Sequence, residues 1–503
     1  MLEKIPATPG TRKRFLFLIL VMLIIGIITL VIFSLPLQKE DTVLENDYKT
    51  YCGSCHLTPD PANIPKSLWK NKVLPEMAVI MGYHHKKNTP YPSPGTSLID
   101  SIKWQQIQNY ILALAPDSIP DTPPRKGRNS PLTQFIPALT TLEHPKPPGG
   151  IVNITFNAAA NQLLIGDVYG RLHEWNGPPP LQRSFNSPLI SSVAEDSTLY
   201  LAEIGIMNPS ELSRGVLYAM SGDTLLPLFQ NLHRPVYTEI NDLNADGQKE
   251  ILICEFGHYT GALSMLVKND TIFEKKTLLA LPGSIKVEIA DMNNDGKKDI
   301  IALFSQGREG IYIFYQKENL EFTHEQVIKL GPEYGLSWFS LLDYNKDGHL
   351  DIILANGDNA DYSNFLKPYH GIRLFINDGA NTFKEEWFYP IHGATRVLAE
   401  DFDKDGDPDF AVLSFFPDFA NNPQEGFVYL ENKDPAAYKF TSYITQKAKK
   451  GNWLVMDKGD FDQDGDVDIL LGNFSLLAAR KVEGINTHDL LYLENTAIKT
   501  KSD

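Results

Sequence analysis

The sequence Asp401-Phe402-Asp403-Lys404-Asp405-Gly406-Asp407-Pro408-Asp409 decides the fold of most of this chain. Acidic residues occupy its positions 1, 3, 5 and 9, and a glycine occupies position 6. Oxygen ligands at alternating positions can wrap around a hard cation such as Ca²⁺, and the glycine permits the sharp turn that this requires. The stretch therefore predicts a calcium-binding turn.

The same pattern occurs five times, in copies that begin 49 to 59 residues apart. A repeat at this interval is typical of a protein built from stacked units, although it is slightly long for a four-stranded blade. The alternative is that each acidic loop only holds a turn, and the two roles do not exclude each other. The candidate metal ligands are positions 1, 3, 5 and 9 of the copies: Asp242, Asn244, Asp246, Glu250; Asp291, Asn293, Asp295, Asp299; Asp343, Asn345, Asp347, Asp351; Asp401, Asp403, Asp405, Asp409; and Asp460, Asp462, Asp464, Asp468.

An EF-hand is the obvious competitor for this pattern, and it fails in all five copies. An EF-hand needs a glutamate at position 12 and flanking helices. Here position 12 is always apolar, and the run that follows each loop, such as Ile352-Ile353-Leu354, is typical of a buried strand.

This strand–loop–strand pattern resembles FG-GAP/VCBS repeats, and the resemblance implies a β-propeller with calcium in the first turn of each blade. Two degenerate copies precede the five. One pairs 163–167 with 171–175, and the other pairs 199–203 with 215–218. Neither has the acidic loop, so metal binding there stays open. Five copies and two give about seven blades, which is within the usual range for propellers.

A second informative stretch is Tyr51-Cys52-Gly53-Ser54-Cys55-His56, whose C-x-x-C-H spacing is typical of c-type haem attachment. Two cysteines three apart can bond both vinyl groups of one haem, and the histidine that follows can ligate the iron. A zinc site would need a second Cys/His pair, and the only other cysteine is Cys254. A thioredoxin-like pair would need a βαβ context, which the proline-rich flanks do not provide.

An electron-carrying haem needs a sixth ligand, and a methionine thioether is a common choice. Met77 follows Pro75 by two residues, which places it at a helix start or bend, and we favour it over Met81. The other methionine would then fill the core. His84 and His85 are expected to face solvent because lysines continue that segment.

Residues from about 41 to 115 resemble a class I-type monohaem cytochrome c domain of the sort fused to repeat propellers in bacterial envelope proteins. The resemblance implies that Cys52 and Cys55 hold the haem covalently and that His56 is its proximal ligand.

The N-terminus predicts export. The run from Phe15 to Phe33 contains 19 residues, nearly all apolar, and follows Arg12-Lys13-Arg14. That length spans a bilayer, and the basic flank keeps the short tail in the cytoplasm. We prefer an uncleaved signal anchor to a cleaved signal peptide, because no small-residue cleavage site is evident. The expected localisation is the cytoplasmic membrane, single-pass, with the bulk of the chain in the periplasm or extracytoplasmic space.

The expected fold class is therefore multidomain: an N-terminal transmembrane helix, a small all-α cytochrome c domain and an all-β propeller of about seven blades. The expected domains are a cytoplasmic tail (1–14), the transmembrane anchor (15–35), the cytochrome domain (41–116), a proline-rich linker (117–150) and the propeller (151–503). A chain of 503 residues can hold this many parts. Its formal net charge of −16 argues against a nucleic-acid partner.

The sequence shows no convincing catalytic constellation, so an electron-transfer protein is favoured over a self-contained enzyme. The expected cofactors are one covalent haem c and calcium at about five sites. The expected partners are the membrane and a redox protein of the envelope. The alternatives are an oxidoreductase whose propeller oxidises a small substrate, and an adhesion or glycan-binding propeller with a vestigial cytochrome.

Loops positioned by a rigid scaffold commonly carry function. The inserts opposite the calcium loops are rich in aromatic residues and could recruit a protein, a small molecule or a glycan, or could simply pack on themselves. They contain His258, Tyr259, Tyr362, Phe365, Tyr369, His370, Phe415, Phe416, Phe419, Phe474 and Leu477.

Overall fold

A computed structural model describes residues 22, 42–86, 89–92, 97–120, 130–142, 148–175, 185–270, 272–359, 365–475 and 488–498. The chain divides into two compact units, Met1–Ser118 and Ile119–Asp503, and each is described here by itself.

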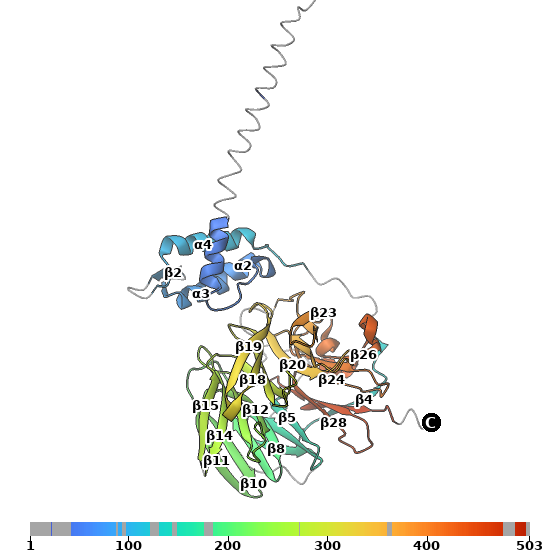
Figure 1. Ribbon diagram of the computed structural model, residues 1–503. Helices are drawn as coiled ribbons and strands as arrows, with labels where there is room; N and C mark the ends of the chain where they lie inside the picture. Colours follow the sequence, from blue (N-terminus) through green and yellow to red (C-terminus); the bar gives the residue numbers. More distant parts are fainter. Residues whose placement is uncertain are drawn as a thin grey trace, which may run out of the picture. The chain divides into compact units, whose positions relative to one another are not determined.

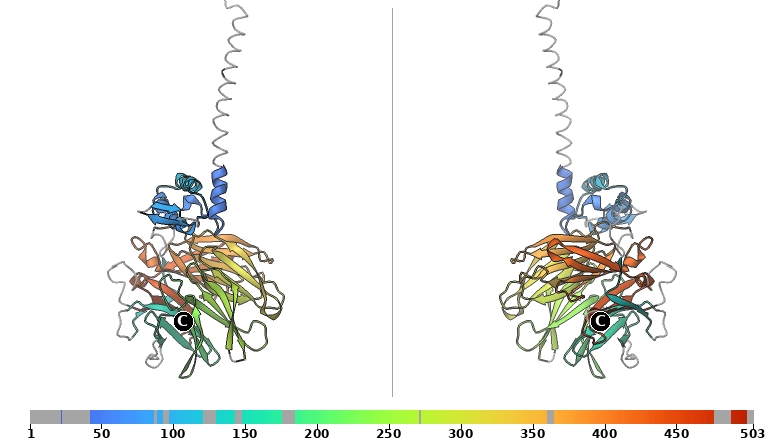
Figure 2. Two further views of the ribbon diagram at one scale, coloured as in Figure 1. Left: turned by 90° about the vertical axis from the view of Figure 1, so that its left-hand side faces the viewer. Right: turned by 90° about the vertical axis from the view of Figure 1, so that its right-hand side faces the viewer.

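The second unit is a seven-bladed β-propeller, which confirms the predicted repeat architecture (Figures 1 and 2). Within each blade, the strands that follow one another in the chain pair antiparallel. The first strands of the blades are β5 (Ile151–Asn157), β8 (Leu189–Glu195), β12 (Pro235–Asn241), β16 (Ser284–Ala290), β20 (Leu336–Leu342), β24 (Ala394–Glu400) and β28 (Trp453–Gly459). Each first strand contacts the first strand of the next blade, and β28 contacts β5, so these seven strands form a closed ring.

The second strands carry the apolar runs seen in the sequence. They are β6 (Gln162–Asp167), β9 (Thr198–Glu203), β13 (Glu250–Glu255), β17 (Asp299–Phe304), β21 (Asp351–Asn356), β25 (Asp409–Ser414) and β29 (Asp468–Asn473). All six residues are buried in each of the five that follow an acidic loop. Because neighbouring blades cover both faces of these strands, their sequences are continuously apolar instead of alternating.

Each blade continues with a third strand, and a further strand lies outside most of these. The third strands are β7 (Leu172–Trp175), β10 (Gly215–Ser221), β14 (Ala262–Asn269), β18 (Gly310–Gln316), β22 (Gly371–Asn377), β26 (Phe427–Asp434) and β30 (Leu490–Asn495). The outermost strands are β11 (Thr224–Leu232), β15 (Ile272–Leu279), β19 (Phe322–Lys329), β23 (Phe383–Pro390) and β27 (Lys439–Ile444). Short 3₁₀ turns η3 (Glu318–Leu320), η4 (Pro423–Gly426), η5 (Pro435–Ala437) and η6 (Gln446–Lys450) join some of them.

The last blade takes its fourth strand from the other end of the unit. Strand β4 (Phe135–Thr140) pairs antiparallel with β30, and β3 (Ser130–Pro131) adds in parallel to β27. Both strands lie within 117–150, where the sequence predicted a proline-rich linker. The ring of blades is thus closed by two segments that are far apart in the chain.

The first unit is not all-α, so the predicted fold class was wrong. Its helical elements are the helix over 42–52, η1 (Pro61–Asn63), α2 (Lys66–Leu68), the π-helical turn η2 (Trp69–Val73), α3 (Leu74–Ile80) and α4 (Ser101–Leu114). Strands β1 (Tyr83–Lys86) and β2 (Thr89–Pro92) form an antiparallel hairpin between α3 and α4. The physical reason lies in Pro90 and Pro92, which cannot donate a backbone hydrogen bond and force the residue before each of them into an extended conformation.

The prediction of a single-pass membrane protein is also corrected. Across the part of the chain that the structure describes, no helix is both long enough and apolar enough to cross a bilayer. The expected anchor at 15–35 falls, apart from Met22, outside the described residues, as does the tail at 1–14.

Candidate metal centres and the cysteine–histidine segment

The five acidic loops have the same position in their blades. Each connects the first strand to the second, as between β24 and β25 or between β28 and β29. The aromatic inserts connect second strands to third strands. Because successive antiparallel strands reverse direction, the acidic loops and the inserts lie at opposite ends of the blades, as the sequence predicted.

Hydrogen bonds from backbone amides to the carboxylate at position 1 shape each loop. In the fourth loop, the Asp405 amide donates to Oδ1 of Asp401 at 3.0 Å and to Oδ1 of Asp403 at 3.1 Å. The Gly406 amide donates to Oδ2 of Asp401 at 3.0 Å. The side chain at position 1 therefore holds the turn at positions 5 and 6, and the other four loops have the same bond from the glycine.

Two residues of each loop have left-handed backbone conformations. The glycine at position 6 has φ of 81° to 97°, as the sequence argument required. Position 4 is also left-handed in all five loops, although it is never glycine: Ala245, Asn294, Lys346, Lys404 and Gln463 have φ of 57° to 63°. A non-glycine residue rarely adopts this conformation, so five repetitions show that the side-chain bonds of the loop impose it.

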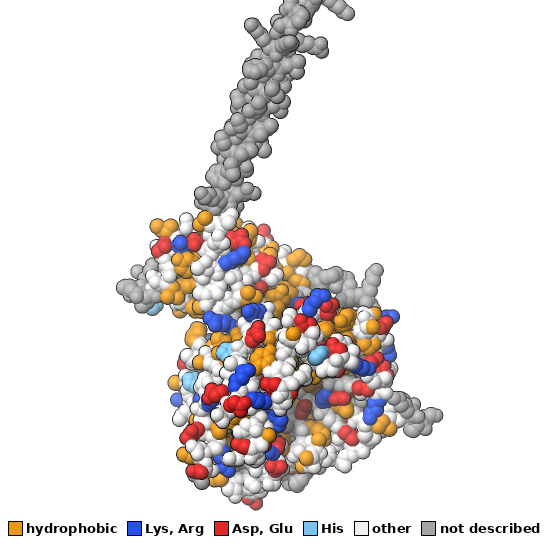
Figure 3. Space-filling view, in the orientation of Figure 1, with side chains coloured by type: hydrophobic (Ala, Val, Ile, Leu, Met, Phe, Trp, Pro, Cys, Tyr) orange, Lys and Arg blue, Asp and Glu red, His pale blue; other side chains and the backbone are white. Residues whose placement is uncertain are grey.

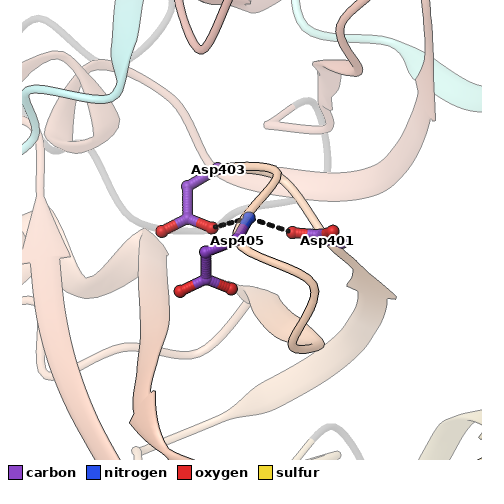
Figure 4. A group of neighbouring side chains, drawn as sticks. All are labelled: Asp401, Asp403 and Asp405. Carbon is purple, nitrogen blue, oxygen red and sulfur yellow. Dashed lines mark hydrogen bonds between the residues drawn. The ribbon is translucent and has the colours of Figure 1, made fainter.

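In two loops the carboxylates at positions 1, 3 and 5 converge. Ligand oxygens of Asp401, Asp403 and Asp405 lie within 4.8 Å of one another, and Figure 4 shows the three side chains gathered around the backbone nitrogen of Asp405. The aspartates of the fifth loop, Asp460, Asp462 and Asp464, form the same arrangement.

The electrostatics of these two loops favour a cation. Burial and the neighbouring charge of Asp405 raise the pKa of Asp403. Burial and the charge of Asp464 likewise raise the pKa of Asp466. Oδ1 of Asp460 is buried and accepts no hydrogen bond from the described residues. Packed carboxylate oxygens with an unsatisfied acceptor are the donor set that Ca²⁺ prefers, so the residues present fit this ion.

The acid at position 9 lies apart from these clusters, at the first residue of the second strand. Asp409 is fully buried, and its two oxygens accept from the Asn432 amide at 2.7 Å and from the Tyr429 hydroxyl at 2.6 Å. Burial raises the pKa of Asp409 to about 7. Asp468 is bonded in the same way by Asn495 and Tyr492. In this structure these two position-9 acids therefore accept hydrogen bonds from the third strand, a role that sequence reasoning missed.

The cysteine–histidine segment begins at the end of the helix over 42–52. Tyr48 packs this helix on α4 through Tyr110, with 5.9 Å between the ring centroids. The chain turns at Gly53, where an added Cβ would lie 2.2 Å from the Lys49 carbonyl oxygen. Glycine is thus required between the two cysteines.

The two cysteines of this segment are not joined to each other, although Ser54 Oγ lies within hydrogen-bond distance of Cys55 Sγ at 3.7 Å. Cys52 is buried, Cys55 is exposed, and neither forms a disulfide. Burial raises the pKa of the Cys52 thiol to about 12. Nδ1 of His56 lies 2.9 Å from the Leu57 carbonyl oxygen, and that contact leaves Nε2 as the nitrogen for another partner.

The structure places the two candidate methionines at opposite ends of one helical turn. Met77 lies within α3 and is half-buried, while Met81 follows the helix and is buried, with 5% of its surface exposed. The Met81 amide donates to the Met77 carbonyl at 2.9 Å. His84 is exposed, as predicted, and the side chain of His85 lies outside the described residues.

The aromatic inserts pack largely on themselves. Phe415 contacts Phe416 and Phe474 with ring centroids 4.8 and 6.2 Å apart, and Tyr369 lies 5.1 Å from Tyr334. Tyr259 is the large exposed aromatic of the described inserts, with 67% of its surface accessible. Tyr362 and Leu477 lie outside the described residues. The packing alternative therefore accounts for most of these side chains.

Comparison with known proteins supports the repeat. Residues 291–354 match the family described as FG-GAP-like repeat. The match begins at the second acidic loop, includes the third one and ends within β21. None of the curated proteins matches the chain.

The chain is similar to several solved structures with which it shares little sequence. The WD40 domain of Neurospora crassa Pan2 is 12% identical, with 73% of this chain and 96% of that chain covered and a TM-score of 0.43. The N-terminal domain of Nup159 is 9% identical over 73% and 97% of the two chains, with a TM-score of 0.41. The β-propeller domain of Myceliophteria thermophila Cps50 (Swd1) is 12% identical over 71% and 99%, with a TM-score of 0.42. Scores this low carry no argument about function.

Proposed function

We propose that this chain is an electron-transfer protein, in which the first unit holds one covalent haem c and the calcium-loaded propeller is a docking scaffold. The observation that carries the proposal is the Cys52–His56 segment, with two unpaired cysteines at a helix end and a histidine directly after them. This arrangement fits covalent attachment of a haem through two thioethers with histidine ligation.

A second observation in the same unit favours a bound acidic group. Trp104 of α4 is 4% exposed, and its indole Nε1 has no acceptor among the described residues. A buried donor without a partner costs about 1–3 kcal/mol. Haem has two propionate carboxylates, and one of them would satisfy this donor.

The residues then have separate roles. Cys52 and Cys55 would hold the group, and His56 would ligate the iron through Nε2 while the Leu57 carbonyl orients its ring. A methionine, Met77 or Met81, would be the sixth ligand. The haem, when bound, supplies one-electron redox chemistry. The closed ring of blades would provide a rigid surface for a redox partner protein.

The proposal is tested by measuring whether haem is covalently bound to the purified chain. The protein is produced in cells that attach c-type haem and is then denatured in acidified acetone, which extracts non-covalent haem. We expect the haem to stay with the polypeptide in the wild type and to lose covalent attachment at one position in Cys52→Ala and in Cys55→Ala. Cys254→Ala, which removes the buried propeller thiol, is the matched control and should keep full attachment. Complete extraction of haem from the wild type would refute the proposal.

The electron-carrier role has its own test. The haem-loaded chain should be reduced and reoxidised reversibly without added substrate. If small sugars or alcohols alone reduced the haem, the chain would be an oxidoreductase and the electron-carrier proposal would be wrong.

A further inference from the structure

The seven first strands bring an unusual set of charged and aromatic side chains to the axis of the propeller. Each strand has seven residues and a register shift after its first residue, so the third residues occupy equivalent positions around the ring. In four consecutive blades these third residues are Tyr237, Lys286, Trp338 and Arg396.

Contacts between non-neighbouring blades show that these side chains meet across the axis. The rings of Tyr237 on β12 and Trp338 on β20 are 6.0 Å apart, although β16 lies between their strands in the ring. Lys286 Nζ lies 4.5 Å from the Trp338 ring centroid, and Arg396 Cζ lies 4.0 Å from it. Trp338 is therefore flanked by two cations at the centre of the ring.

The carboxylates near this cluster already have donors. Glu288 pairs with Lys286 at 2.5 Å and accepts from the Leu341 amide at 3.1 Å. Asp457 accepts from the backbone amides of Phe156 and Lys458 at 2.8 and 3.0 Å. Glu239 receives a hydrogen bond from the hydroxyl of Tyr237.

Arg396 differs from these groups, because its guanidinium forms no hydrogen bond or ion pair with the described residues, although the nearby charge of Asp457 acts on it. Two more deeply buried arginines do: Arg373 binds Glu385 at 2.8 Å, and Arg234 donates to the carbonyls of Ile206 and Met207. Burial lowers the pKa of Arg396 to about 10, so it stays charged at neutral pH. Its side chain is half-buried, which leaves accessible surface beside it.

Trp338 supplies a second donor without a partner. The residue is 9% exposed, and its indole Nε1 is buried with no acceptor among the described residues. The Arg396 guanidinium carbon lies 4.0 Å from the centroid of the Trp338 ring, so the guanidinium and the indole N–H are close enough to bind two oxygens of one anion. Lys286 Nζ, 4.5 Å from the ring centroid, adds a second positive charge beside the ring.

We propose that the axis of the propeller is a binding site for a small oxyanion, a carboxylate or a phosphate-like group, held by the Arg396 guanidinium and the Trp338 indole N–H. The site shares no residue with the acidic loops or with the Cys52–His56 segment. Its test is therefore independent of the haem and calcium proposals. It gives the propeller a ligand of its own, with a single anionic group as the recognised feature.

Isothermal titration calorimetry at pH 6 and constant ionic strength tests this, with sodium sulfate as the tetrahedral probe and sodium acetate as the carboxylate probe. We expect saturable binding of at least one anion to the wild type, and the stronger of the two identifies the ligand class. Arg396→Gln and Trp338→Phe should each weaken it about tenfold, since each removes a donor to a charged acceptor. Arg308→Gln, at an exposed arginine of the same unit, should leave it unchanged.

Two outcomes would overturn the site. One is the absence of saturable binding of either anion to the folded wild type. The other is unchanged affinity in Trp338→Phe, which keeps the aromatic ring and removes only the N–H donor. This variant decides the question even if Arg396→Gln does not fold, and the melting temperature of each variant reports its folding.

Discussion

Gln134 donates a hydrogen bond of 2.6 Å from its Nε2 to Oδ1 of Asn495. Asn495 is fully buried, and its own amide donates to the carbonyls of Phe402 and Val467 at 2.9 and 3.0 Å. This side chain therefore joins the segment before β4, the end of β30 and two acidic loops. The closure of the propeller depends on these contacts between its first and last strands.

Removal of Phe135 should open this closure. The Phe135 ring is 2% exposed and packs edge-on against Phe402 and Tyr429 at 5.6 and 5.3 Å. Phe135→Ala should lower the free energy of unfolding by about 3–5 kcal/mol, because it leaves a cavity in a close-packed core. Urea unfolding followed by circular dichroism measures the loss.

Ile136→Ala is the control for this prediction. Ile136 is the next residue of β4, is 52% exposed and faces away from that core. Its replacement should change stability by less than about 1 kcal/mol. Equal losses in the two variants would show that β4 contributes through its backbone pairing alone.

The sequence predicted the blades because each carries its own local pattern. The acidic loop, its glycine and the apolar second strand lie within one short segment, so a single copy such as 401–414 is enough to identify them. Strand β4 has no such pattern. It contains Pro137, which an outermost strand tolerates because one side needs no backbone donor, and its partner β30 is at the other end of the chain.

The cluster at the propeller axis, formed by Tyr237, Lys286, Trp338 and Arg396, could not be predicted for a related reason. Tyr237 and Trp338 contact each other only because the ring of first strands closes, and neither has a distinctive local pattern. The left-handed conformation of the position-4 residues of the acidic loops, such as Lys404, also could not be predicted from their residue types. It follows from the bonds made by the aspartates around them.

Calcium should stabilise the propeller through the acidic loops. Excess EDTA should lower the melting temperature of calcium-loaded protein, because the carboxylates of Asp401, Asp403 and Asp405 repel each other without a cation. Asp405→Ala should reproduce part of this loss and reduce the further effect of EDTA. Differential scanning calorimetry measures both effects.

Glu325→Ala, at an exposed acid of β19, is the matched control for removal of one negative charge. It should melt as the wild type does and keep the full response to EDTA. A calcium-loaded wild type that melts at the same temperature with and without EDTA would contradict a stabilising role for the ion.

The sixth haem ligand should be revealed by replacing each methionine in turn. The sequence favours Met77, which is half-buried within α3. Met77→Ala should abolish the weak absorption band, at the near-infrared edge of the visible spectrum, that ferric haem shows with a thioether ligand. Met81→Ala should keep this band but lower the stability of the protein, because it removes a buried side chain. The reverse result in the absorption spectra would assign the ligand to Met81.

Glu239 should make the stability of the propeller fall as the pH rises toward neutrality. Burial, and then the charge of Glu288, raises the pKa of Glu239 to about 7, while Lys286 opposes this rise and Tyr237 hydrogen-bonds the carboxylate. The charge of Glu195 adds to the rise. The folded state therefore keeps a proton that the unfolded state has already lost.

The sign follows from this difference in bound protons. Below about pH 4.5 both states are protonated, and Glu239 does not affect stability. Between that pH and 7 only the folded state holds the proton, so the free energy of unfolding falls with rising pH, by about 3 kcal/mol at most.

Glu239→Gln removes the titrating group and should be more stable than the wild type at pH 8, with the difference shrinking as the pH falls toward 5. Urea unfolding at pH 5, 6, 7 and 8 measures this, with Glu274→Gln on the exposed strand β15 as the control. Parallel stability curves for Glu239→Gln and the wild type would show that Glu239 is ionised in the folded propeller throughout this range.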